Sequence, residues 1–415
     1  LGFLFLSNYI SLKHQDPLPK RAKISLTLAI VTWSGGLILL LCILCLWSKF
    51  RIAINVVETA ADFITDYPKI ITVPVIMLFG LIIYVIYWIV VAVYIFSVGD
   101  VDYVEGRSYG LVEWSVFTRF FWYVHCFALF WNASFILAIS IFVITTGACI
   151  WYFAPDRKKL ESPIAKGFTW GLVYHVGTLA MGSLLVAIAW FLQMIFSYLY
   201  QKFNARAKTA HTGTGCLLKC SICVVTVYEK FIKFINRHAY IETVLKSDSF
   251  CTAASNATAL IVKNAMKFGI LHGLAQMVII FGNLAIAILT TIASYYLIQF
   301  AEIVSDGVFE TNAPLILCFI IGFIIAALFG HVFDVSADAI VHCYLIDIDS
   351  QPSAKAKHSF PNIEAAMEKG ALKQSKQLRK AETAAVKELA TLDDKNYKDN
   401  EPLLMDNDPK MVERK

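Results

Sequence analysis

Residues 69–97 read KIITVPVIMLFGLIIYVIYWIVVAVYIFS, and Lys69 at their start is the only charged residue among them. Crossing the apolar core of a bilayer, which is about 30 Å thick, takes roughly 20 consecutive apolar residues in one helix. A helix satisfies its own backbone hydrogen bonds, which lipid cannot do. This stretch therefore predicts a transmembrane helix, with Pro74 near its start as a kink or entry point.

Further apolar runs of similar length lie on both sides of this stretch. They are residues 24–48, 118–153, 168–200, 270–299 and 313–345. The 415-residue chain is 58% hydrophobic and 16% charged, whereas soluble domains are about half apolar and about a quarter charged. We therefore predict an all-α fold, a polytopic transmembrane helix bundle, and exclude a water-soluble domain.

Composition divides the chain into three parts. Residues 1–23, which open on LGFLFLSNYI without an initiator Met or a signal peptide, are expected to be the end of an earlier membrane helix and a loop of a longer protein. Residues 24–350 would form the bundle, with amphipathic surface helices at 51–66 and 226–265. Residues 351–415 are rich in Ala and charge, which predicts a partly helical or disordered cytoplasmic tail.

The amphipathic pattern is clearest in residues 51–66. Val56, Ala60 and Phe63 share one face, and Glu58 lies opposite. Such a helix lies either on the membrane surface or against the bundle.

Loop charges predict the side on which each loop lies, since Lys and Arg are enriched in cytoplasmic loops. Residues 156–159, DRKK, are therefore predicted to be cytoplasmic, and the acidic loops 98–106 and 301–310 external. The net charge of +5 accordingly reports topology and does not predict nucleic-acid binding.

The loop charges do not give a consistent topology for the segment that follows residue 200. If residues 168–200 cross the membrane once, Lys202 and Arg206 fall on the external side, against the rule. Either one long run is re-entrant, or another crossing lies within 213–265.

Enzymatic motifs are missing from the sequence. It contains no GxxxxGK[ST], HExxH or GxSxG pattern. Its ten cysteines fall mostly in apolar runs and imply no disulfide framework. Cys220 and Cys223 form one C-x-x-C without a second ligand pair, which favours palmitoylation beside the membrane over zinc binding. We predict no catalytic residue, no metal and no cofactor, so the protein is not expected to be an enzyme.

Aromatic residues are dense in RFFWYVHCFALFWNASF, residues 119–135. Tyr123, Phe127 and Trp131 are spaced four apart and so share a helix face. A quaternary ammonium has no N–H donor and is bound through cation–π contacts with such faces. An aromatic belt at the membrane interface has the same pattern.

Asp334 and Asp338 lie one helical turn apart within an apolar run. They could form an anionic site for a cation or a proton relay, or they could lie near a helix end, hydrogen-bonded to a neighbouring helix.

Small residues predict close helix packing at two places. These are Gly177, Gly182 and Ser183, and the pair Gly269 and Gly273.

Several phrases together resemble the choline transporter-like family. They are RIAINVVETAADFI (51–64), FALFWNASFILAI (127–139), HVGTLAMGS (175–183) and EKFIKFINRHAYI (229–241). The resemblance implies a multi-pass membrane transporter of choline or a related cationic amine, with small amines and membrane lipids as partners.

The chain also departs from the family pattern. Where that pattern has a Gln and an Arg, the chain has Trp190 and Gln193, and another family Arg becomes Ser255. Four charged family positions become His272, Gly273, Gln276 and Asn283, whereas Asp338 matches a family Asp.

Two functions remain open at this point. In the first, the protein transports a choline-like cation or an ethanolamine-type amine by alternating access. Tyr123, Phe127 and Trp131 would form the aromatic cage, Asp338 would supply negative charge, and Tyr174 and His175 would assist. In the second, suggested by the lost charges, it is a transport-silent paralogue that serves as a structural subunit among other membrane subunits. Either protein would be integral to the plasma membrane or an intracellular membrane.

Overall fold

The structure is a computed structural model that describes residues 54, 56–103, 110–157, 159–206, 213–305 and 312–350, together with scattered residues between 6 and 37. The contacts divide the chain into residues 1–363 and 364–415, and all of the second unit lies outside the described residues. The predictions for 351–415, for nearly all of 1–23 and for most of 24–48 therefore fall outside the described residues as well.

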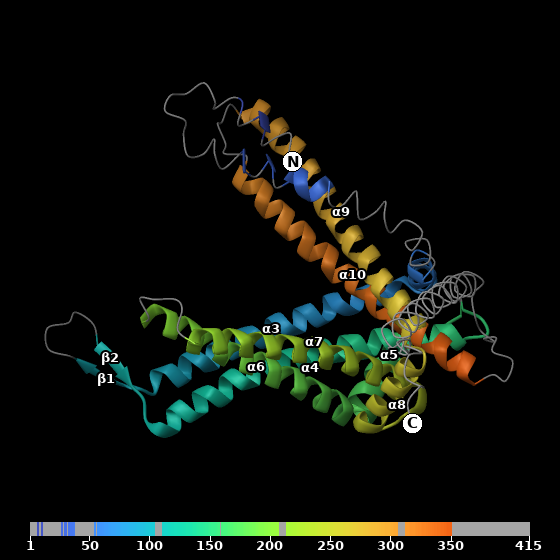
Figure 1. Ribbon diagram of the computed structural model, residues 1–415, viewed down its shortest axis with the longest axis horizontal. Helices are drawn as coiled ribbons and strands as arrows, with labels where there is room; N and C mark the ends of the chain where they lie inside the picture. Colours follow the sequence, from blue (N-terminus) through green and yellow to red (C-terminus); the bar gives the residue numbers. More distant parts are fainter. Residues whose placement is uncertain are drawn as a thin grey trace, which may run out of the picture. The chain divides into compact units, whose positions relative to one another are not determined.

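The described chain is built almost entirely of helices, which confirms the all-α class (Figure 1). The elements are η1 (Pro68–Ile71), α3 (Thr72–Ser97), β1 (Asp100–Tyr103), β2 (Gly110–Glu113), α4 (Val116–Phe153), α5 (Pro163–Thr169), η2 (Trp170–Tyr174), α6 (Val176–Arg206), α7 (Gly213–Lys246), α8 (Phe250–Lys263), α9 (Ala265–Ser305) and α10 (Asn312–Asp349). Within the described residues, five segments are long and apolar enough to cross a membrane: Pro68–Ser97, Val116–Phe153, Val176–Phe203, Ala275–Phe300 and Ala313–Asp349.

The acidic loop between α3 and α4 contains the described part's two strands. β1 and β2 pair antiparallel, with Asp100 opposite Glu113. α4 then begins at a capped end, where the Ser115 side chain accepts a hydrogen bond from the Thr118 backbone N–H at 3.2 Å.

Helix α4 lies at the centre of the packing, since it contacts α3, α5, α6, α7 and α10. Its second half is the most buried part of the fold, with Phe142, Trp151 and Tyr152 almost fully enclosed. The helical segment 56–66 packs here: Phe63 is fully buried, and its ring centroid lies 5.6 Å from that of Trp151. The apolar face expected in this segment is thus buried against the helices.

The run 168–200 is not one helix. It begins in α5, passes through a single π-helical turn, η2, and continues as α6. Gly167 is required in α5, because a Cβ there would lie 3.0 Å from the Cα of Val143 in α4. Periodicity cannot reveal a π turn, and such turns often mark functional sites.

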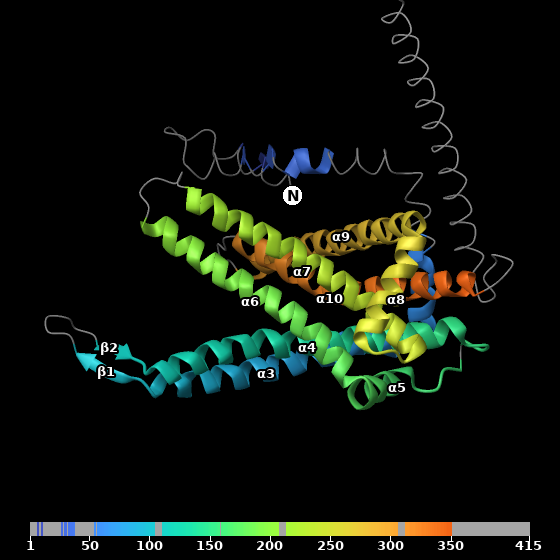
Figure 2. The same ribbon diagram turned by 60° about the horizontal axis from the view of Figure 1, so that its bottom comes forward.

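Residues 213–246 form one continuous helix, α7, which lies beside α6 (Figure 2). The segment expected to form surface helices, 226–265, is therefore divided between the second half of α7 and α8. Gly182 permits the close approach of α6 and α7, since a Cβ there would lie 2.2 Å from the Tyr240 hydroxyl oxygen.

The small-residue prediction is confirmed at Gly182. Among the residues that the structure describes, a Cβ at Gly177, Gly269 or Gly273 would have nothing within 4 Å, so no close packing is seen there. Helices α9 and α10 lie side by side, and their close contact instead involves Gly322, whose Cβ would lie 3.2 Å from Thr290 Cβ.

Candidate functional site

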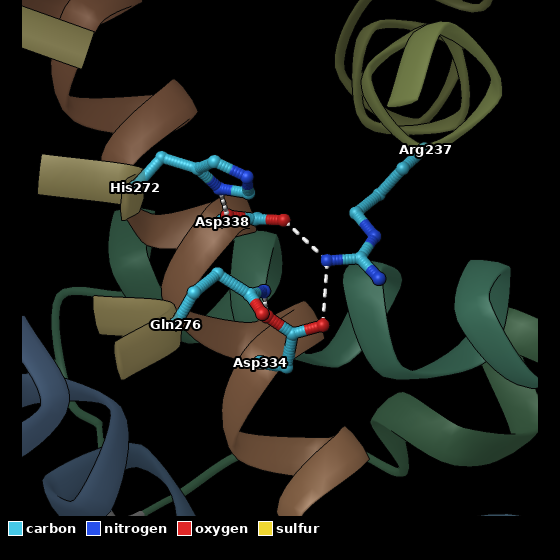
Figure 3. A network of polar contacts seen from close by, with 5 residues as sticks. All are labelled: Arg237, His272, Gln276, Asp334 and Asp338. Atoms are coloured by element: carbon cyan, nitrogen blue, oxygen red, sulfur yellow. Dashed lines mark hydrogen bonds and ion pairs between the residues drawn. The ribbon is translucent and has the colours of Figure 1, made fainter. Parts of the chain in front are cut away.

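Arg237 of α7 reaches α10 and binds both of its interior carboxylates (Figure 3). One guanidinium nitrogen lies 2.7 Å from an oxygen of Asp334 and 2.5 Å from an oxygen of Asp338. The two aspartates stand one helical turn apart, so a single side chain can bridge them. The Asp338 side chain is 4% exposed and that of Asp334 is 15% exposed, so both charges are largely removed from solvent.

Helix α9 supplies the remaining partners of this cluster. His272 Nδ1 lies 2.6 Å from the other oxygen of Asp338, and the Gln276 amide donates to the other oxygen of Asp334 (Figure 3). Every carboxylate oxygen of the pair is therefore hydrogen-bonded, as a buried charge requires. The cluster ties three helices together.

A second group of polar side chains follows the Asp338 cluster. It comprises His342, one turn further along α10, and Glu242 and Lys246 of α7. His342 Nε2 lies 3.1 Å from Glu242, and Glu242 is also paired with Lys246 at 2.5 Å. His238 stacks on His342, with ring centroids 5.6 Å apart. Imidazoles and carboxylates thus continue beyond the Asp338 cluster, buried between α7 and α10.

A cavity of about 220 Å³ lies among α4, α6, α7 and α10. Its polar and aromatic lining comprises Ser134, Ser183, Trp190, Lys233, Asn236, Arg237, Tyr240 and His331. Pockets for drug-sized ligands measure about 300–1,000 Å³, so this cavity suits a smaller molecule.

Two residues of the cavity lining, Trp190 and Lys233, meet at the carboxylate of Glu229, which is not itself part of that lining. Trp190 Nε1 donates to a Glu229 oxygen at 2.7 Å, and the Lys233 ammonium lies 2.5 Å from the same oxygen. That ammonium also lies 4.9 Å from the centroid of the Trp190 ring, within the range of a cation–π contact.

The predicted aromatic stripe lies on α4, outside the lining of this cavity. Phe127 and Trp131 touch, with ring centroids 6.3 Å apart, and the Trp131 indole donates to the Ala180 carbonyl of α6 at 3.3 Å. Tyr123 is 57% exposed and Trp131 38% exposed. Ser134, a residue of the cavity lining, lies one turn further along α4, and its hydroxyl donates to the Trp131 carbonyl at 3.0 Å.

The other predicted site residues lie at two different places. Tyr174 ends the π turn and is 71% exposed, whereas the adjoining His175 ring lies 6.0 Å from that of Phe142. Asp338 lies in the buried cluster, and its partner Arg237 lines the cavity. The structure thus links Asp338 to a residue of the cavity lining, Arg237, but does not bring it to the aromatic stripe.

Sequence reasoning missed the contributions of α7. Glu229, Lys233 and Arg237 recur every four residues on one face, which was the available signal. The amphipathic pattern of α7 predicts a surface helix instead. Its partners Trp190 and Asp338 are 39 or more residues away from it in the sequence, so local pattern could not identify them.

Comparisons with known proteins agree with this architecture. A family described as plasma-membrane choline transporter matches residues 30–349. Choline transporter-like protein 2 of Dictyostelium discoideum is 28% identical over 310 residues, which cover 74% of this chain and 48% of that protein. Choline transporter-like protein 1 of Xenopus laevis is 25% identical over 373 residues, covering 87% of this chain and 55% of that protein.

A human relative, choline transporter-like protein 2, is 30% identical over 243 residues, which cover 57% of this chain and 34% of that protein. The chain spans about half the length of the curated relatives that it matches most extensively.

Proposed function

Since the chain belongs to the choline transporter-like family, we propose that it carries choline or a related organic cation, such as an ethanolamine-type amine, across a membrane by alternating access. The observation that carries this proposal is the cavity bordered by Arg237, which holds Asp334 and Asp338. Ionisable groups inside a membrane bundle are costly, so a charged cluster beside a cavity is the expected mark of a transport pathway.

Alternating access requires a defined set of crossings, and we propose that α7 is one of them. At 1.5 Å per residue its 34 residues extend about 50 Å, more than the bilayer core. If α7 crosses, the acidic loop 301–310 becomes external and the end of α10 cytoplasmic, as the charges predict. Without this crossing the loop 301–310 would be cytoplasmic and the end of α10 external, against the charge rule.

The carboxylates would act as the counter-charge of the pathway. A cation entering the cavity meets Arg237 first, and the negative charge of Asp334 and Asp338 becomes available to it when that guanidinium shifts. Asp338, the more buried of the two, is the stronger candidate.

In this proposal the predicted aromatic residues act outside the cavity, on the route by which the substrate enters it. Trp131 lies at the α4–α6 contact next to the cavity residue Ser134, so we assign Tyr123, Phe127 and Trp131 to the route into the cavity. Tyr174 ends the π turn and His175 lies between that turn and α6, so both would respond to movement of that helix.

Uptake of labelled choline and ethanolamine tests the proposal, with the full-length protein in proteoliposomes and empty vesicles as the reference. Saturable uptake that Asp338→Asn abolishes is the expected result. Lack of uptake by well-folded protein that co-purifies in fixed stoichiometry with other membrane subunits would instead favour the transport-silent subunit. Of these two functions, the transporter and the transport-silent subunit, the cavity supports the transporter.

A further inference from the structure

Trp190 and Lys233 of the cavity lining, together with their shared partner Glu229, supply the components of an ammonium site. An aromatic face and a carboxylate are the two groups that bind an alkylated ammonium, through cation–π attraction and charge. Here both act on one cation, the ammonium of Lys233, which lies 4.9 Å from the indole centroid and 2.5 Å from Glu229.

The indole and the carboxylate are held in place independently of Lys233. The Trp190 indole donates to Glu229 at 2.7 Å, and its ring centroid lies 6.4 Å from that of Phe130 in α4. The Glu229 side chain is only 15% exposed. These contacts would keep the site assembled if the ammonium left.

Lys233, by contrast, can leave. Its side chain is 48% exposed, and its ammonium stands at the end of a flexible four-carbon stem. Lys233 and Trp190 both line the cavity, so a ligand in the cavity would have direct access to this position.

We propose that Trp190 and Glu229 form the subsite for the substrate's ammonium group, and that Lys233 is a tethered occupant that the substrate displaces. This inference rests on the proposed function and names the class of ligand, a quaternary or otherwise alkylated ammonium. The exchange replaces one ammonium by another, so the charge around Glu229 is unchanged. It also explains how a cavity lined by Lys233 and Arg237 can accept a cation.

A ligand with a phosphate group would have the opposite requirement. It would be attracted by the ammonium of Lys233 and the guanidinium of Arg237, so it would need Lys233 to stay. Removing the charge of Lys233 should therefore raise the affinity for an ammonium ligand and lower the affinity for a ligand with a phosphate group.

Equilibrium binding of radiolabelled choline to the purified full-length protein in lipid nanodiscs tests the inference. K233M should tighten choline binding about tenfold, because it removes the competitor, and W190L should weaken it about tenfold. W190F, which keeps an aromatic face, should weaken it less. In the double variant K233M/W190L the gain from K233M should be largely lost.

The matched control is K230M, which removes another exposed lysine of α7 and should leave binding unchanged. A gain in affinity cannot arise from misfolding, so K233M remains informative if W190L proves unstable. Weaker binding by K233M, or equal binding by well-folded W190L, overturns the inference and leaves the proposed function standing. Absence of choline binding by the unaltered protein overturns both.

Discussion

A guanidinium nitrogen of Arg237 lies 2.5 Å from a carboxylate oxygen of Asp338, although the two residues are 101 positions apart in the chain. This contact joins α7 to α10, and the same nitrogen reaches Asp334. Such a partner offsets part of the cost of burying two carboxylates. The ion cluster therefore joins the helices and places two carboxylates and a guanidinium next to the cavity-lining side chain of Arg237.

Arg237→Gln should destabilise the protein strongly. It leaves two buried carboxylates without their cation, and removing one partner of a buried ion pair costs about 3–5 kcal/mol. The apparent melting temperature in detergent measures this loss. Lys159→Gln, which breaks an exposed pair with Asp156 at 3.7 Å, should change it little. Equal melting temperatures for the two variants would contradict the cluster's structural role.

Gly182→Ala should weaken the packing of α6 against α7. The new Cβ would lie 2.2 Å from the Tyr240 hydroxyl and 3.2 Å from the Phe250 ring, and overpacking costs about 1–3 kcal/mol. Gly177→Ala is the matched control, because a Cβ there meets nothing within 4 Å and Ala favours helix by up to about 1 kcal/mol. The first variant should melt earlier than the unaltered protein and the second should not. The reverse order would be inconsistent with this packing.

The proposed crossing of α7 predicts that its two ends lie on opposite sides of the membrane. Cys216 near its start and Cys251 in α8 are both exposed thiols. In single-cysteine variants, a membrane-impermeant maleimide added to intact cells should label Cys216, and Cys251 should react only after permeabilisation. Labelling of both from one side would show that α7 does not cross.

Trp131→Ala should reduce choline uptake about tenfold if Trp131 lies on the entry route, since a lost cation–π contact is worth about 0.5–2 kcal/mol. Trp131→Phe, which retains a ring, should keep most of the uptake. Initial rates in proteoliposomes measure both. Uptake that is insensitive to Trp131→Ala would assign the stripe to the lipid interface instead.

Cys149 of α4 and Cys343 of α10 should cross-link under oxidation, because their sulfur atoms are 3.5 Å apart. In a variant that keeps only these two cysteines, copper–phenanthroline should form an intramolecular disulfide, seen as a loss of two hydrogens in the intact mass. A variant that keeps Cys149 and Cys318 should not react in this way. Both thiols are buried in the folded protein, so the denatured variant, in which they are open to the reagent, shows whether the oxidation itself works. Lack of reaction in the folded protein with a small, membrane-permeant oxidant that does react with the denatured variant would contradict the contact.

Helix length was the property that the sequence predicted best. The run 118–153 became α4, Val116–Phe153, because Ser115 caps its start and Pro155 follows its end. Hydropathy reports the length of an apolar run and not its hydrogen-bonding pattern, so it could not show the π turn that breaks 168–200.

The candidate site was predicted less completely, for a physical reason. Asp338 was recognised because a carboxylate in an apolar run is conspicuous. Arg237 was not, because its own helix is charged and its partners lie in another part of the chain. The spacing of Tyr123, Phe127 and Trp131 correctly predicts a shared face of α4, but spacing alone cannot show whether that face borders a cavity or lipid.

The π turn at Trp170–Tyr174 has a mechanical consequence for α6. Gly167 on one side of it is pressed against the Val143 backbone, whereas Gly177 on the other side has open space around it. At 1.5 Å per residue, Trp190 lies about 22 Å along α6 from His175, so a bend of about 10° would swing it by about 4 Å. Spin labels at residues 166 and 199 would detect such a bend as a change in their separation when choline is added. In that event the π turn would be the hinge of α6, and a small rotation there would carry the Trp190 indole away from the ammonium of Lys233.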